Sequence, residues 1–205
     1  MIGREWTRVG ITMGLMAFAG SVAGTSAQEA SAKSEPEKYG GIVMVTNAPA
    51  RGVVHFRLTV DRWSTDEERK AYVEAIKAGG SDGLAAAMEK VTVGYIQLDQ
   101  NLRYPIAYAV KGPTDKGVMI RVATNRPISI KEQNRGFVSK GYPIGVVELL
   151  LPPEGPGNGS ILGAARVQFN DKGQLEVESL PQNTGPQRVE QVEREVPKPK
   201  KEMKK

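Results

Sequence analysis

The stretch Gly52–Glu68 reads GVVHFRLTVDRWSTDEE and contains both a strand pattern and a helix start. From Val54 to Val60 apolar and polar side chains alternate, which is typical of a strand with one face on a core and the other in water. Sheets that are wet on one side are usually antiparallel. Ser64 and Glu67 then have the spacing of a capping box. We therefore expect the chain to pass directly from this strand into a helix.

The predicted helix runs for about three turns, because Gly79-Gly80 offers a left-handed stop. Its core-facing stripe consists of Arg69, Tyr72, Val73 and Ile76. Ser81 follows the glycine pair and can cap a second short helix, with Leu84, Ala87 and Met88 as its inward side. The sequence thus predicts two short helices after the strand of the opening stretch.

Seven other segments have strand character and are bounded by Gly, Pro, Asn or Asp clusters. They cover residues 41–48, 91–98, 103–111, 118–124, 144–151, 161–169 and 174–180. The last two flank Asn170-Asp171-Lys172-Gly173, which predicts a hairpin. The fold class expected is mainly β: an antiparallel barrel or sandwich of about eight strands, with two short helices inserted after the second strand.

The N-terminus has the pattern of a secretory signal over residues 1–27. Arg4 and Arg8 precede an apolar run that ends in small residues at Thr25-Ser26-Ala27. No later run is long enough to span a bilayer, so no transmembrane span is expected after signal cleavage. The predicted organisation continues with a flexible leader at 28–40, a single β-rich domain at 41–180 and a basic, disordered tail at 181–205.

The charge of the chain is concentrated at its C-terminal end. The formal net charge is +5, and five lysines against Glu202 put most of it in the last nine residues. These lysines are Lys198, Lys200, Lys201, Lys204 and Lys205. The remaining chain is close to neutral, which argues against nucleic acid as a partner. The tail could instead bind an anionic envelope surface, while a solvated end is the simpler interpretation.

The sequence has no cysteine and one histidine, His55. This excludes disulfides, thiol catalysis and cysteine metal sites, and a zinc centre would lack most of its usual ligands. His55 lies on the polar side of its strand, where a surface or packing role competes with a role as ligand or base. No cofactor, metal site or catalytic residue is assigned. Export without disulfides indicates a bacterial envelope or medium, hence a secreted or periplasmic location.

Carboxylates provide two further candidates. Asp61, Asp66, Glu67 and Glu68 could contain a pair for hydrolysis, although helix capping accounts for three of them. Glu148 lies in the apolar run 144–151, so its charge needs a partner or a shifted pKa. Arg121 and Arg166 are the possible partners. A structural ion pair is one interpretation, and a polar spot inside a barrel that orients a ligand is the other.

Aromatic side chains could line a cavity for a small apolar or amphipathic ligand, although aromatics at alternate strand positions more often pack in the core. The full set of candidate ligand-binding residues is Trp63, Tyr95, Tyr104, Tyr108, Arg121, Glu148 and Arg166.

Three motifs resemble an uncharacterised family of short secreted bacterial proteins. They are Trp63-Ser64-Thr65-Asp66-Glu67-Glu68-Arg69, Val93-Gly94-Tyr95-Ile96 and Ala123-Thr124-Asn125-Arg126-Pro127-Ile128. In that family a W-S-T-D-x-E-R helix start precedes a G-Y-I strand and a later A-T-(D/N)-R-P-I turn. The resemblance covers roughly residues 50–180. It implies export and similar domain limits, and it brings no activity and no catalytic residue.

The function expected from the sequence is an exported, non-catalytic binding or structural module of the bacterial envelope. One alternative is a carboxylate-dependent hydrolase that acts on an envelope or extracellular substrate. The other is an interaction protein tethered to anionic surfaces by its C-terminal tail.

Overall fold

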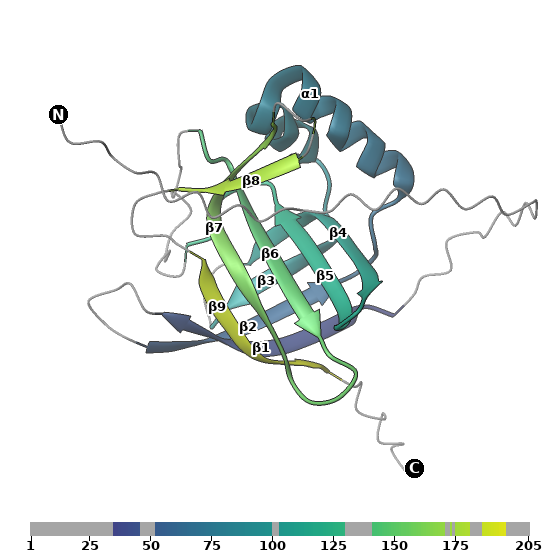
Figure 1. Ribbon diagram of the computed structural model, residues 1–205. Coiled ribbons are helices and arrows are strands. Elements are labelled where there is room, and N and C mark those ends of the chain that lie inside the picture. Colours follow the sequence, from purple (N-terminus) through teal and green to yellow (C-terminus); the bar gives the residue numbers. More distant parts are fainter. Residues whose placement is uncertain are drawn as a thin grey trace, which may run out of the picture.

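The computed structural model describes residues 35–45, 52–99, 103–129, 141–170, 173, 175–180 and 186–195. Nine strands and one helix are found in this part of the chain (Figure 1). The elements are β1 (Glu37–Val45), β2 (Gly52–Val60), α1 (Asp66–Met88), β3 (Gly94–Leu98), β4 (Tyr104–Thr114), β5 (Gly117–Thr124), β6 (Ile144–Leu151), β7 (Gly157–Phe169), β8 (Leu175–Ser179) and β9 (Gln187–Arg194).

Eight of the strands form a closed antiparallel barrel. Strands β1 to β7 each pair with the next along the chain, and β9 closes the ring by pairing with both β7 and β1. Strand β8 lies outside the ring, as the second arm of a hairpin with β7. The predicted β class is therefore confirmed, and its open choice between barrel and sandwich is decided in favour of the barrel.

The barrel interior is a packed core. The opening stretch supplies Phe56, Leu58 and Val60, which alternate with exposed or half-exposed residues as the sequence predicts. The largest interior side chains that are less than 2% exposed come from most of the ring, and they include Leu58, Ile96, Tyr104, Ile120, Leu149 and Ile161. Large side chains from opposite walls therefore fill the space that a carrier protein of this shape would leave for a ligand.

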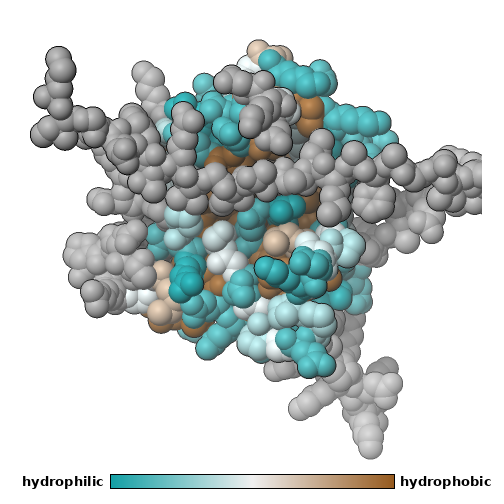
Figure 2. Space-filling model, viewed as in Figure 1, coloured by the Kyte–Doolittle hydropathy of each residue, from teal (hydrophilic) through white to brown (hydrophobic). Residues whose placement is uncertain are grey.

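Helix α1 packs against the outer wall of β4 to β7 near one end of the barrel (Figure 1). Tyr72, Ile76, Leu84 and Met88 are its main buried side chains. On the face seen in Figure 2, hydrophobic residues gather between α1 and the barrel, and the rest is mostly hydrophilic. The packing of this amphipathic helix therefore creates a second, smaller core outside the ring.

The helix start and its interruption were predicted with small errors. The capping box is formed by Thr65 and Glu68, one residue later than expected. The two helices expected on either side of Gly79-Gly80 are one element whose backbone leaves helical geometry at these glycines, with φ of 59° at Gly80. Of the predicted inward residues, Arg69, Val73 and Ala87 are exposed.

Two serines bind α1 to the barrel, one just before the helix and one directly after its interruption at Gly79-Gly80. Ser64 donates its backbone N–H to Ala109 O (2.8 Å), and its Oγ accepts the N–H of Ala109 (3.0 Å). Ser81 also bonds both backbone groups of one strand residue, Val167, and uses its hydroxyl for both. Its Oγ accepts the N–H (2.6 Å) and donates to the carbonyl oxygen (2.8 Å). Each serine thus makes the two hydrogen bonds that a residue of a neighbouring strand would make. The sequence analysis expected Ser81 only as a helix cap.

Two predicted boundaries need correction. Strand β1 begins at Glu37, inside the segment 28–40 that was expected to be a flexible leader. Strand β9 lies inside the segment 181–205 that was expected to be a disordered tail. The signal segment at 1–27 and the five tail lysines lie outside the described residues.

Strand β9 escaped the sequence analysis because a bulge hides its alternation. Val189 and Val192 are three residues apart, a helical spacing, yet both lie in the interior at 0% and 1% exposure. Gln191 between them has a φ of 54°, and the β1–β9 register shifts beside it. The extra residue lets both valines point inward.

Candidate functional site

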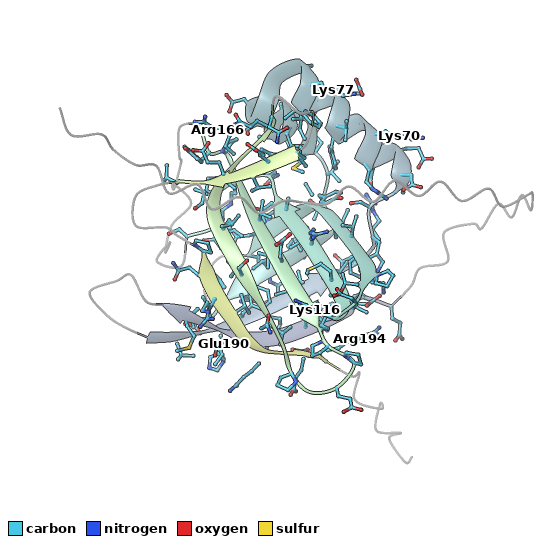
Figure 3. The ribbon with its side chains drawn as sticks, in the orientation of Figure 1. Lys70, Lys77, Lys116, Arg166, Glu190 and Arg194 are labelled. Atoms are coloured by element: carbon cyan, nitrogen blue, oxygen red, sulfur yellow. The ribbon has the colours of Figure 1, made fainter. Side chains whose placement is uncertain are left out.

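The seven residues predicted to bind a ligand do not form one site. Trp63 lies at the end of the barrel where β1 begins, and Tyr104 lies inside the barrel near the other end. Tyr95, Tyr108, Arg121, Glu148 and Arg166 belong to the outer wall, on five different strands. Figure 3 shows Arg166 beside β8, far from Lys116 and Arg194 at the opposite end. The structure therefore does not bring these seven residues together in one cavity.

Glu148 and Arg121 form the ion pair that the sequence suggested. They are direct cross-strand partners, with Arg121 Nε 2.6 Å from Glu148 Oε1. Both point outward, because their chain neighbours Val147, Leu149, Ile120 and Val122 fill the interior. The hypothesis of a polar spot inside the barrel is therefore wrong, and the structural ion pair is the interpretation that fits.

Arg166 has other partners. Its Nε donates to Gly141 O (3.2 Å), and its guanidinium lies 4.7 Å from the centre of the Tyr142 ring. Glu178 on β8 accepts from the Tyr142 hydroxyl and lies 3.8 Å from Arg166 Nη1. This cluster ties the β7–β8 hairpin to the chain before β6.

Two of the predicted tyrosines, Tyr104 and Tyr108, serve packing. Tyr104 is fully buried, donates to Ser129 O (2.7 Å) and carries the guanidinium of Arg126 over its ring. Tyr108 packs edge to face against Tyr72 of α1, with ring centres 6.1 Å apart. Burial raises the pKa of Tyr108, while the guanidinium groups of Arg69 and Arg121 oppose this shift. Neither ring is arranged to receive a ligand.

The carboxylates considered for hydrolysis are held at the helix start. Asp66 Oδ1 pairs with Arg69 (2.9 Å), and Glu68 pairs with Arg62 (2.7 Å) as well as closing the capping box. The hydrogen bond from Arg62 is the main cause that lowers the pKa of Glu68. Capping and ion pairing therefore account for this cluster.

Among the described residues, no group of three His, Asp or Glu side chains could hold a metal ion.

Glu37 forms a polar cluster that the sequence did not predict. Its carboxylate accepts hydrogen bonds from Lys111 Nζ (2.6 Å), the Tyr39 hydroxyl (2.7 Å) and Trp63 Nε1 (3.1 Å). Arg194 Nη2 lies 3.5 Å away. Burial alone would raise the pKa of Glu37, but the hydrogen bonds outweigh it and lower the pKa to about 2. This carboxylate joins β1, β4, β9 and the segment before α1.

An open groove lies on the outer wall of β1, β2 and β3. Its volume is about 610 Å³. It is lined by Gly40, Gly41, His55, Phe56, Arg57, Gln97, Asp99 and Glu195. The floor is low because β1 contributes two adjacent glycines, so no side chain rises from Gly40 between the strands beside it. We call this feature the outer groove.

The polar groups of the outer groove are held by the strand ladder. Asp99 has a φ of 48° and exchanges two hydrogen bonds with His55: its carboxylate accepts the His55 N–H, and its own N–H donates to His55 O, both at 2.7 Å. Arg57 is the cross-strand partner of Gln97, and its Nε lies 3.4 Å from Glu195 Oε1. The result is a row of donors and acceptors that faces solvent.

The sequence contained part of the signal for this groove. His55 was noted as a polar residue of an amphipathic strand, and Arg57 stands on the same face. Gly40 and Glu195 were missed because they belong to the segments that were expected to be leader and tail. A glycine pair in an alternating strand is the signal that could have been used.

Comparisons with known proteins found nothing: no protein-family model, no curated protein and no solved structure matches this chain. In the part of the chain that the structure describes, no helix combines the length and the apolar character that crossing a membrane requires.

Proposed function

We propose that the protein is an exported, non-catalytic binding module of the bacterial envelope that holds its ligand in the outer groove. The observation that carries this proposal is the contrast between the two faces of the wall. The interior is filled by side chains that are almost completely buried, whereas the outer wall of β1 to β3 has an open groove lined by five polar side chains. A ligand can reach only the second of these without unfolding the core.

Export rests on the signal-like N-terminus, and a secreted or periplasmic location follows from it. A barrel closed by hydrogen bonds all round, without a disulfide, suits a module that must stay folded outside the cell. The packed interior favours binding or a structural role over the transport of an enclosed apolar ligand.

A second candidate is the carboxylate-dependent hydrolase, favoured by one observation. The outer groove brings Asp99 and Glu195 together with His55, which are residue types used in acid and base chemistry. Against this candidate, Glu195 is already engaged by Arg57, with Glu195 Oε1 3.4 Å from Arg57 Nε.

An NMR titration of the ¹⁵N-labelled protein tests both candidates. The probes are maltohexaose, chitohexaose, spermine and inorganic pyrophosphate, one at a time. We expect at least one probe to shift the amides of residues 40, 55, 57, 97 and 99 saturably, with no change near Arg121 and Glu148 on the opposite wall. Saturable shifts confined to other surfaces would contradict the groove as the binding site. Cleavage products in the sample would contradict the non-catalytic binding module and support the hydrolase.

A further inference from the structure

We propose that the outer groove binds a neutral, polyhydroxylated chain, that is, a segment of an oligosaccharide. This inference rests on the proposed function and names the ligand class of the same groove. It follows from three properties of the groove: its charge, its mixture of hydrogen-bonding groups and an aromatic ring beside it.

The charge of the groove disfavours anions. Arg57 is its one guanidinium, whereas Asp99 and Glu195 bring two carboxylates, and Glu195 already lies 3.4 Å from Arg57. A phosphate or an acidic peptide would therefore meet a net repulsive surface. A neutral ligand meets no such penalty.

The hydrogen-bonding groups suit hydroxyls. A hydroxyl donates one hydrogen bond and accepts others, so a chain of hydroxyls needs donors and acceptors side by side. The guanidinium of Arg57 donates, the carboxylates of Asp99 and Glu195 accept, and the amide of Gln97 does both. His55 adds a ring that can do either. Arg57 and Gln97 stand opposite each other on neighbouring strands, so they can contact adjacent hydroxyls.

Tyr95 supplies an apolar surface next to these polar groups. It is the next outward residue of β3 beyond Gln97, stands opposite Thr59 of β2 and is 36% exposed. The guanidinium of Arg103 lies 5.9 Å from the centre of its ring. The C–H face of a sugar ring can pack on such an aromatic ring while the hydroxyls at its rim bind polar side chains.

The outward row from His55 to Thr59 spans about 13 Å along β2, which is longer than one sugar ring. The groove is open, so a chain can continue past both ends. We therefore infer that the ligand is an internal segment of a longer chain rather than a single sugar.

The test is a set of binding measurements with maltohexaose and chitohexaose, together with spermine and pyrophosphate as charged probes. We expect one of the hexasaccharides to bind with shifts at residues 55, 57, 97 and 99. Its affinity should change little when salt rises from low to high, because no charge is neutralised. The variant Tyr95→Ala should weaken binding by about tenfold, whereas Tyr95→Phe, which keeps the ring, should bind within about twofold of the original protein.

The outcomes separate this inference from the proposed function. Binding of spermine or pyrophosphate in the groove, without hexasaccharide binding at about 10 mM, would overturn the saccharide and leave the groove as a binding site. Failure of all four probes to shift the groove amides would contradict both the saccharide inference and the groove as a binding site. Saccharide binding that is unchanged in Tyr95→Ala and leaves the groove amides unshifted would also overturn the inference.

Discussion

At the scale of single residues, Glu37 shows how one buried charge can stabilise a barrel. Its side chain is only 15% exposed, yet Lys111, Tyr39 and Trp63 all donate to it. A buried carboxylate is tolerable only when it is paired and hydrogen-bonded in this way. The cluster could not be predicted from sequence patterns, because its members come from four places along the chain.

The pKa of Glu37 predicts a pH dependence. The folded-state pKa of about 2 lies below the ordinary value of 4.5, so the carboxylate stabilises the fold above pH 4.5. That contribution, about 3 kcal/mol, is lost as the pH falls from 4.5 towards 2. Glu37→Gln should lower the free energy of unfolding by about 2 kcal/mol at pH 7 and flatten its decline in acid.

Urea unfolding between pH 2 and 7 measures this effect. Glu154→Gln is the matched control, because Glu154 is an exposed carboxylate in the β6–β7 loop, and it should change stability by less than about 0.5 kcal/mol. Identical acid profiles for Glu37→Gln and the original protein would show that Glu37 is not held as described.

At the scale of elements, strong local patterns were predicted well. Strand β6 has the predicted bounds, and the β7–β8 hairpin has its turn at Asn170, whose carbonyl accepts the N–H of Gly173 (2.9 Å). The docking of α1 could not be predicted, because Ser64 and Ser81 bond to strands 45 and 86 residues away. Such contacts depend on tertiary structure and leave no periodic trace in the sequence.

The Ser81 contact gives a prediction for helix docking. Ser81→Ala leaves the N–H and the carbonyl of Val167 without the hydroxyl that now bonds them, at a buried position. We expect a loss of about 2 kcal/mol in unfolding free energy, together with faster hydrogen exchange of the Val167 amide. Asp82→Ala, on the exposed neighbour, should change neither quantity appreciably. Unchanged exchange at Val167 in Ser81→Ala would refute this role of the serine.

At the scale of the whole molecule, closure of the barrel decides where a ligand can bind. The opening stretch predicted the inner and outer faces of β2 correctly, and hence which side chains of that strand are available to solvent. It could not predict the groove, because the groove also needs glycines of β1 and the residue after β9. Those segments lack the regular alternation that identified the other strands.

Two glycines allow the groove to be tested without disturbing the barrel. A Cβ added at Gly40 would lie 3.5 Å from Glu195 Oε1, an ordinary contact, and one added at Gly112 of β4 would meet nothing within 4 Å. Neither glycine has a positive φ, and valine suits a strand. Gly40→Val therefore fills the floor of the outer groove, and Gly112→Val is its matched control on another strand.

The measurement that tests the central claim most directly is the affinity of the original protein, Gly40→Val and Gly112→Val for the same hexasaccharide, with thermal unfolding recorded alongside. We predict that all three proteins unfold at similar temperatures, that Gly112→Val binds like the original protein, and that Gly40→Val binds at least about tenfold more weakly. Undiminished binding by a folded Gly40→Val would contradict a ligand site in the outer groove.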